Sequence, residues 1–223
     1  MKKKITNSYK IGFTLAEVLI TLGIIGVVAA LTLPSLVANY RKHVVENKLK
    51  KFYTIMNQAV KFSEAKYGEF AYWGGFESGN VDTMTEWWNK YFAPHVKTLK
   101  TETQPGSSML WVYLVDGTAL AIFNYGSGTV NQSVHIYFYP KSSFSFSKQG
   151  TMGKDYFTFF INSSTNKTYA IVEPYKFSWD GTETSLKSGP YGCYNTSGGA
   201  RHYCTALIQF HGWKIPDDYP YKF

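Results

Sequence analysis

One apolar run near the N-terminus decides what this chain can fold into. Residues 13–38 hold a single charged side chain, Glu17, in 26 positions. Because about 20 apolar residues in a helix cross the hydrocarbon core of a bilayer, this run is long enough to span a membrane. An ionisable group at membrane depth is costly and marks a function by default, so Glu17 needs a partner.

A short basic segment precedes the apolar run. It contains no acid and four lysines: Lys2, Lys3, Lys4 and Lys10. Positive residues beside a membrane span keep their end in the cytoplasm, so we expect a cytoplasmic N-terminus and an extracytoplasmic remainder. A cleaved signal peptide fits poorly, because its apolar core is only about 7–15 residues long and would not hold Glu17. A plain signal anchor fits the length but leaves Glu17 unexplained.

The rest of the chain, residues 39–223, is long enough to bury a core of its own. The net charge of +8 suggests a nucleic-acid or anionic-membrane partner, but four lysines precede Gly12, so a chain cut there carries 8 − 4 = +4. Apart from Arg41-Lys42 and residues 48–51, no stretch concentrates Lys and Arg as a nucleic-acid groove would. We therefore favour a solvated helix face over nucleic-acid binding.

The chain has only two cysteines, Cys193 and Cys204. In an exported domain an isolated pair of this kind is most simply a disulfide. Zinc is the alternative, because His202 and His211 lie nearby in sequence. Two cysteines with ten residues between them and scattered histidines do not match the close ligand pairs of structural zinc sites, so we predict the disulfide.

Hydrophobic periodicity predicts one long helix from Phe13 to about Tyr67, apolar all round in its first half and amphipathic in its second. The apolar positions of the second half are Val45, Leu49, Phe52, Met56, Ala59 and Val60. The opposite, polar face carries Lys48, Lys50, Lys51, Asn57 and Lys61. Pro34 removes one backbone hydrogen bond and should kink the helix. Gly26 with Ala30 forms a small-residue face for close helix packing.

Sheet signals follow the long helix. A short helix is expected around residues 83–92, and two apolar runs within residues 109–123 flank Asp116-Gly117, which predicts a hairpin with a two-residue turn. Further strands are expected at 134–139, 155–161 and 168–172, and a loop at 182–199. The pattern predicts an α+β fold in which the long N-terminal helix packs against an antiparallel sheet.

Residues 12–20, Gly-Phe-Thr-Leu-Ala-Glu-Val-Leu-Ile, resemble the class III leader junction of type IV prepilins and type II secretion pseudopilins. A basic leader, Gly followed by Phe, the acid Glu17 and the late proline Pro34 coincide, and the resemblance covers about the first 40 of 223 residues. It implies a leader over 1–12, a transmembrane or filament-core helix over 13–38, and a pilin-like extracytoplasmic domain over 39–223 that includes the amphipathic half of the helix.

The resemblance also implies roles for single residues. A prepilin peptidase would cut between Gly12 and Phe13 and then methylate the new amino group of Phe13. Glu17 would meet that positive amine on a neighbouring subunit, and such a charge pair suits fixing register between helices. The stretch from Gly26 to Pro34 looks unwound in some filaments of the family, which would let adjacent helices pack at different heights.

The implied partners are the peptidase, identical or related pilin subunits and an inner-membrane assembly platform. The implied location is the inner membrane, crossed once, and then a pilus or pseudopilus filament. The sequence contains no G-x-S-x-G, H-E-x-x-H or complete P-loop motif, so we expect no enzyme and no cofactor.

Calcium is one ion to consider, because some pseudopilins bind it through loop carboxylates. The candidate ligands are Asp180, Glu183, Asp217 and Asp218. They form no EF-hand pattern, so acids of surface turns are the favoured interpretation. His95, His135 and His211 show no paired acid or nucleophile in sequence, and we expect core or surface histidines.

The sequence thus predicts a structural pilin-type subunit. The alternative is a ligand-binding module, a minor pilin or adhesin that captures glycan or DNA, displayed on a pilin stem. Aromatic residues make up 18% of the chain and would serve either a thick β core or such a binding surface. Solvent exposure of the tyrosines and tryptophans separates the two hypotheses.

Overall fold

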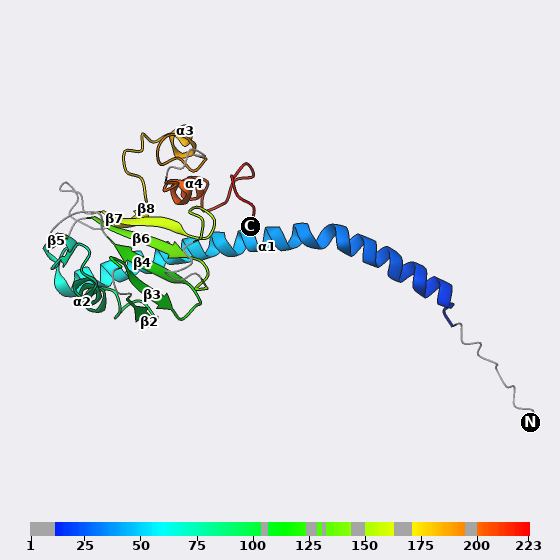
Figure 1. Cartoon of the computed structure of the whole chain (residues 1–223), viewed down its shortest axis with the longest axis horizontal. Coiled ribbons are helices and arrows are strands. Elements are labelled where there is room, and N and C mark those ends of the chain that lie inside the picture. The colour runs from blue at the N-terminus through cyan, green and yellow to red at the C-terminus, as the bar shows by residue number, and fades with distance from the viewer. Residues whose placement is uncertain are drawn as a thin grey trace, which may run out of the picture. The chain divides into compact units, whose positions relative to one another are not determined.

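The computed structural model of the chain describes residues 12–103, 107–123, 129–130, 133–143, 150–162, 171–194 and 200–223 (Figure 1). The chain forms two units, Met1–Arg41 and Lys42–Phe223. One helix, α1 (Leu15–Tyr67), belongs to both. Of the leader expected over 1–12, only Gly12 lies within the described residues.

Helix α1 confirms the long helix expected from the periodicity. It passes Gly26 and Pro34 without a break, so the kink expected at Pro34 does not interrupt it. In the first unit none of its side chains is buried, and the helix is long and apolar enough to cross a membrane. At its other end Gly68 has a φ of +82° and its N–H donates to the carbonyl of Glu64 at 2.9 Å, the left-handed glycine cap typical of helix ends.

The second unit contains a six-stranded antiparallel sheet in the order β2-β3-β4-β6-β7-β8. Its strands are β2 (Thr98–Glu102), β3 (Leu110–Leu114), β4 (Ala119–Phe123), β6 (Ser133–Tyr139), β7 (Phe157–Asn162) and β8 (Ile171–Pro174). A separate pair joins β1 (Phe76–Glu77) and β5 (Thr129–Val130). This layout confirms the predicted α+β class.

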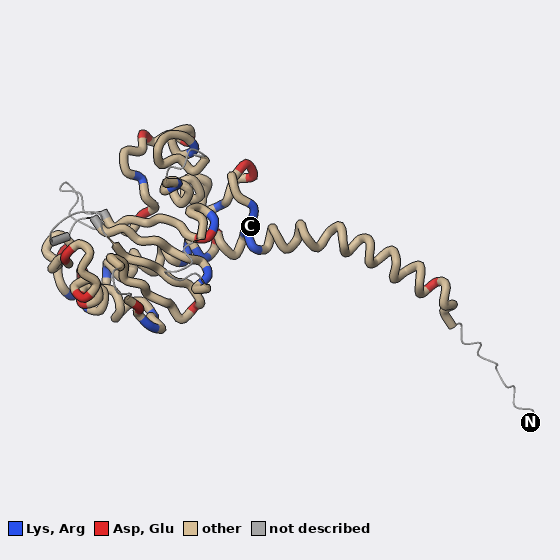
Figure 2. The backbone as a smooth tube through the Cα atoms, in the orientation of Figure 1, with Lys and Arg blue, Asp and Glu red and all other residues tan. Residues whose placement is uncertain are grey.

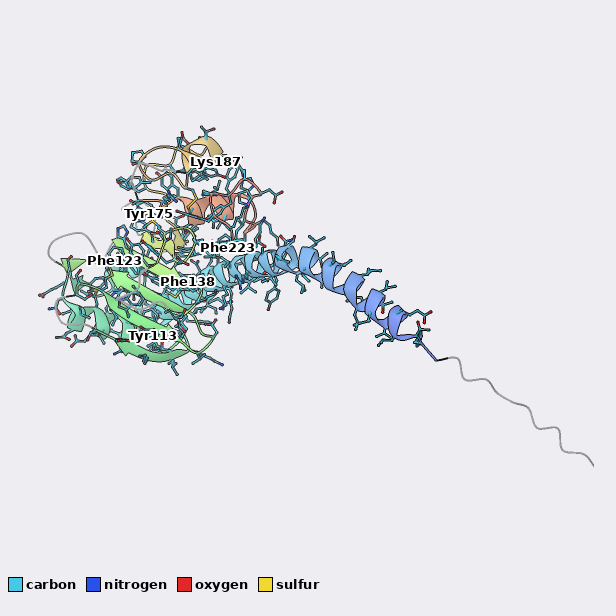
Figure 3. The ribbon with its side chains drawn as sticks, turned by 45° about the vertical axis from the view of Figure 1, so that its right-hand side comes forward. Tyr113, Phe123, Phe138, Tyr175, Lys187 and Phe223 are labelled. Atoms are coloured by element: carbon cyan, nitrogen blue, oxygen red, sulfur yellow. A yellow bond between two sulfur atoms is a disulfide. The ribbon has the colours of Figure 1, made fainter. Side chains whose placement is uncertain are left out.

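The amphipathic half of α1 packs on one face of this sheet, and all six of its predicted apolar positions are buried. Phe52 of α1 stacks on Phe138 of β6 with ring centroids 4.2 Å apart and meets Phe159 of β7 edge-on at 4.9 Å. Figure 3 shows Phe138 where α1 meets the sheet, with Tyr113 on β3. The other face buries a second cluster that includes Trp111 and Tyr139, so β3 and β4 are buried on both faces and read as continuous apolar runs.

The polar face of α1 is not simply solvated, as the sequence had suggested. The Asn57 side chain donates to the carbonyl of Val172 at 2.8 Å and accepts the Val172 N–H at 3.1 Å, as a paired strand would. Lys48 donates to the carbonyl of Pro140 at 2.6 Å. Both side chains are partly buried and hold α1 to the sheet.

The hairpin of β3 and β4 is confirmed, but its turn is longer than predicted. The Leu114 N–H donates to the Thr118 carbonyl at 2.9 Å, which leaves Val115, Asp116 and Gly117 in the loop. Gly117 has a φ of +76° and donates back to Leu114 at 3.2 Å. This is the three-residue connection built from a turn plus a left-handed residue.

Several helices and strands differ from expectation, and β1 and β5 were not predicted. Helix α2 (Val81–Tyr91) starts two residues early, because the Asn80 side chain caps it by accepting the N–H groups of Asp82 and Thr83. Helix α3 (Glu183–Lys187) lies in the expected loop 182–199, whereas α4 (Cys204–Phe210), the 3-10 turn η1 (Phe70–Tyr72) and β2 were not predicted. The strand expected at 168–172 begins at Ile171, and residues 168–170 lie outside the described part.

The predicted disulfide is present: Cys193 and Cys204 are joined with an S–S distance of 2.01 Å. It ties the segment after α3 to the first residue of α4. His202 and His211, the two histidines for which zinc was considered, form hydrogen bonds with other residues. His202 is 3.2 Å from the Thr158 hydroxyl, and His211 is 2.9 Å from the Glu183 carboxylate.

One buried acid, Glu46 of α1, fastens the C-terminal segment to the helix. Its carboxylate accepts the Ile215 N–H, the Lys214 ammonium and a His43 ring nitrogen, each at 2.9 Å. Burial by itself raises the pKa of the Glu46 carboxyl, but these hydrogen bonds outweigh it and hold the pKa below its usual value. This role could not be predicted from the sequence, because an acid inside a lysine-rich helix is ordinary surface composition.

Replacing this acid should weaken the fold in a pH-dependent way. Because the folded pKa is depressed, the stabilising contribution of Glu46 is complete above the unfolded pKa of about 4.3 and is lost as pH falls through the folded value. We expect Glu46→Gln to lower the free energy of unfolding at pH 7 by about 1–3 kcal/mol, as for lost hydrogen bonds to a charged group. The loss should shrink below pH 4.

Denaturant unfolding of the full chain in detergent, followed by circular dichroism, measures this difference. Glu69→Gln is the matched control, because Glu69 is exposed. Equal stability of the Glu46 variant and this control at pH 7 would contradict the role given to Glu46.

Candidate processing and assembly site

The residues expected to be processed lie at the open end of α1. Gly12, Phe13 and Thr14 precede the first helical turn, and Phe13 is 89% exposed. A Cβ placed on Gly12 would meet no atom within 4 Å. The fold of this chain therefore does not require glycine at position 12, and any such requirement comes from what binds there.

Thr14 and Glu17 form a reciprocal capping box at the start of α1. One carboxylate oxygen of Glu17, Oε2, accepts both the Thr14 N–H and the Thr14 hydroxyl at 2.8 Å. The Thr14 hydroxyl oxygen accepts the Glu17 N–H at 3.3 Å. The Thr-x-x-Glu spacing is the known signature of a capping box, so this arrangement could have been predicted from the sequence.

The capping box changes the status of the lone acid. Glu17 has a partner within its own chain, the neutral Thr14, and it lies at a helix N-terminus, where the backbone dipole favours an anion. Within the described residues, only Oε2 of this carboxylate is bonded. The second oxygen, Oε1, keeps its acceptor capacity for a donor from another molecule.

The structure separates the other predicted assembly residues from this end. Gly26 and Pro34 lie further along α1, and a Cβ on Gly26 would meet nothing within 4 Å. The hydroxyls of Thr21 and Thr32 donate to carbonyls of the preceding turn, at 2.9 Å each. Glu17 is thus the one side chain of the apolar run that keeps a charge.

The four calcium candidates are engaged in other contacts. Asp180 accepts the N–H and hydroxyl of Thr182 and the hydroxyl of Ser185. The remaining three pair with basic side chains: Glu183 with Lys187 and His211, Asp218 with Lys187, and Asp217 with Lys42. In the described part of the chain no three His, Cys, Asp or Glu residues gather as a metal site would require.

Most of the large aromatic side chains serve the core. Four of the six tryptophans are almost fully buried: Trp73, Trp87, Trp88 and Trp111. An exposed aromatic group remains near α4, where Phe177 is 60% exposed and Phe210 48% exposed. Trp179 meets Phe210 edge-on at 6.3 Å, and its indole N–H donates to the carbonyl of Thr182.

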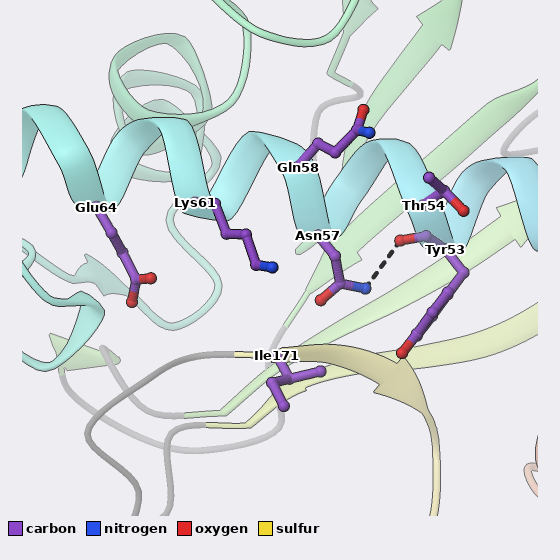
Figure 4. A pocket seen from close by; sticks show the side chains of 7 residues that line it. All are labelled: Tyr53, Thr54, Asn57, Gln58, Lys61, Glu64 and Ile171. Carbon is purple, nitrogen blue, oxygen red and sulfur yellow. Dashed lines mark hydrogen bonds between the residues drawn. The ribbon is translucent and has the colours of Figure 1, made fainter.

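A groove of about 550 Å³ lies along α1 beside the first residue of β8 (Figure 4). Its lining is mostly polar and consists of Tyr53, Thr54, Asn57, Gln58, Lys61, Glu64 and Ile171. The Asn57 amide is already bonded to the backbone of Tyr53 and Val172. The groove therefore presents both polar groups and apolar carbon surface along the helix.

Comparison with known families gives two matches that together cover almost the whole chain. Residues 35–223 match a family described as "Family of unknown function (DUF6613)". The chain belongs to that family. Residues 7–33 match the "Prokaryotic N-terminal methylation motif". This motif marks type IV pilins and pseudopilins, and it confirms the resemblance drawn from residues 12–20.

No match was found among curated proteins or among solved structures. The DUF6613 family description assigns no activity to the globular unit. What supports a function for this pilin-type chain is therefore its N-terminal motif and the geometry of its own residues.

Loss of the capping box should loosen the start of α1. In Thr14→Val the Glu17 N–H loses its hydroxyl acceptor and the Glu17 carboxylate loses one of its two donors, and N-cap replacements of this kind cost about 0.5–2 kcal/mol. We expect faster amide hydrogen exchange in the first turn, measured by NMR on the full chain in micelles. Thr14→Ser keeps the hydroxyl and is the control. Equal exchange in both variants would contradict the capping box.

Proposed function

We propose that this chain is the precursor of a structural pilin-type subunit. The match of residues 7–33 to the methylation motif is the single observation that carries the proposal. Its support in the structure is a helix end where Gly12 is unobstructed, Phe13 is exposed and Glu17 has a free carboxylate oxygen. We take 1–12 as leader, 13–38 as membrane-spanning or filament-core helix, and 39–223 as extracytoplasmic domain.

Processing would expose the charge that assembly needs. A prepilin peptidase on the cytoplasmic side hydrolyses the amide between Gly12 and Phe13, which frees the Phe13 amine and releases the basic leader. Methylation of this amine keeps its positive charge. The exposed backbone on both sides of the bond gives a protease close approach, and glycine offers the least obstruction.

Assembly would then pair unlike charges between neighbouring copies. The Phe13 amine of one subunit donates to the Glu17 carboxylate of the next, in apolar surroundings where an unpaired charge is costly. Thr14 holds one carboxylate oxygen in place through two bonds of 2.8 Å, which orients the other. The helix-breaking tendencies of Gly26 and Pro34 would allow adjacent helices to adjust their packing.

The exposed apolar side chains of the first unit require a non-aqueous surrounding. Leu19, Ile24 and Val27 are each about 60% exposed, and no side chain of the run is buried. Before assembly the bilayer supplies that surrounding, in a single pass with a cytoplasmic N-terminus, and afterwards the packed helices of other subunits do. The remaining partner is an inner-membrane assembly platform. No step of this function needs catalysis by the chain or a bound cofactor.

Burial of four of the six tryptophans supports the structural hypothesis over display of a glycan- or DNA-binding module. A binding module of that kind would have to use the remaining exposed aromatic side chains of the globular unit, among them Phe62, Tyr72, Phe177 and Phe210. The distribution of aromatic side chains therefore favours a core function for most of them.

A bulky residue at position 12 should block maturation. In Gly12→Phe the peptidase meets a side chain where it needs open backbone, so we expect only full-length precursor on a gel of cell membranes. Gly23→Ala, which also adds a side chain to an unobstructed glycine, is the control and should mature normally. Normal cleavage of the Gly12 variant would refute the proposed processing site.

Removing the carboxylate should separate processing from assembly. Glu17→Val should be inserted and cleaved like the wild type, yet be absent from sheared filaments, because the Phe13 amine of the next copy loses its partner. Thr21→Val is the matched control, since the Thr21 hydroxyl bonds only to carbonyls of its own helix. Filaments with normal content of the Glu17 variant would remove the charge-pairing step.

A further inference from the structure

The globular unit carries a basic and an acidic surface at opposite ends of its part of α1. The basic band consists of Lys48, Lys50 and Lys51, within one turn of α1, and of Lys141, which follows the Pro140 carbonyl bonded by Lys48. Of these four, only Lys51 pairs with an acid within the described residues, Asp116 at 2.7 Å. The band therefore keeps a net positive charge.

The acidic patch consists of Glu77, Asp82 and Glu86, all exposed. Figure 2 shows acidic residues gathered around α2, to which Asp82 and Glu86 belong at positions four apart, on one face. In the part of the chain that the structure describes, none of the three forms an ion pair. The basic side chains nearest in sequence, Lys66 and Lys90, contact aromatic rings instead.

These neighbouring lysines lie over aromatic rings. Lys66 is 4.9 Å from the ring centre of Tyr67, and Lys90, the only basic residue of α2, is 5.0 Å from that of Tyr91. A capping role explains Asp82, which lies in the first turn of α2 and complements its dipole. Glu77 accepts a hydrogen bond from the side chain of Asn80, the N-cap residue, at 3.0 Å, whereas capping does not explain Glu86.

The two surfaces are too far apart to neutralise each other in one chain. Helix α2 packs on the end of α1, where the Ser63 hydroxyl donates to the Tyr91 carbonyl and the Tyr67 and Tyr91 rings lie 5.3 Å apart. Lys50 lies 17 residues before Tyr67, which is about 26 Å along a helix. Screening at physiological salt acts over about 8 Å, so the charges do not interact within one molecule.

We propose that the acidic patch of one copy docks on the basic band of a second copy displaced along the helix direction. This inference rests on the proposed assembly function and names its second contact. The partner is a copy of the same chain because this chain holds both complementary halves, and complementary potentials fix register between partners. A contact between different patches is heterologous, so it extends into an open array and does not close a pair.

The same charges oppose association before assembly. Copies inserted in one membrane stand at the same height, which places basic band beside basic band and acidic patch beside acidic patch. A displacement along the helix direction brings unlike charges together. The surfaces therefore favour the staggered arrangement of a filament over side-by-side pairs in the bilayer.

Zero-length carbodiimide cross-linking tests this contact directly, because it joins a lysine only to a carboxylate that touches it. The full chain is produced in its native host grown on 14N medium and then shifted to 15N medium, so that each cell holds both kinds of copy and mass spectrometry separates links between copies from links within one. We expect mixed-isotope links from Lys48, Lys50 or Lys141 to Asp82 or Glu86 in sheared filaments. We expect none in the membrane pool.

Charge reversal gives the second measurement. Asp82→Lys/Glu86→Lys and Lys50→Glu/Lys141→Glu should each reduce filament yield by about tenfold or more, since like charges placed together oppose association. The combined variant should recover most of the yield. Lys154→Glu, an exposed lysine outside the band, is the control and should assemble normally.

The outcomes are distinct from those of the proposed function. Filaments whose mixed-isotope links avoid these residues, or links to them in the membrane pool, would overturn the docking contact and leave the Glu17 pairing intact. A link from these residues to a different protein would overturn the second copy as partner. Correct maturation at Gly12 without any filament would refute both the assembly function and this contact.

Discussion

One continuous helix has to be stable in two different surroundings, and the rest of the structure follows from that constraint. In its first half α1 is apolar on all sides, which only lipid or other helices can cover. In its second half the apolar side chains lie on one face of the helix only. The sheet covers this face, with Phe52 stacked on Phe138. The change occurs near Arg41, where the chain divides into its two units.

The elements found from sequence are those whose burial is one-sided or complete. The apolar stripe of α1 and the apolar runs of β3, β4 and β6 extend over the whole length of these elements, and all four elements were predicted. Strand β2 was missed because Thr-Leu-Lys-Thr-Glu is a mostly exposed edge with no apolar alternation. Helices α3 and α4 are short, and α4 is buried along most of its length, so neither shows helical periodicity.

The candidate site was found from sequence as a set of residues, but its local geometry was not. Gly12 and Phe13 came from the resemblance of residues 12–20 to prepilin leader junctions, whereas Glu17 was also marked by its charge inside an apolar run. The bonds between Thr14 and Glu17 were overlooked because an acid in an apolar run prompts a search for a distant cation, whereas a neutral hydroxyl three residues away already bonds it. Asn57 and Glu46 were missed for a related reason: polar residues on a helix look solvated until their tertiary partners are known.

Sheet edges offer the other common way for chains to associate, and both edges here are closed to it. At β8 the Asn57 amide occupies the N–H and carbonyl of Val172, and the strand ends at Pro174, which has no N–H to donate. At β2 the pairing shifts between Thr98 and Lys100, and an irregular, charged edge of this kind resists strand addition. Within the described residues, both edges of the six-stranded sheet are therefore poor sites for strand addition, which favours the proposed association through helix packing and surface charge.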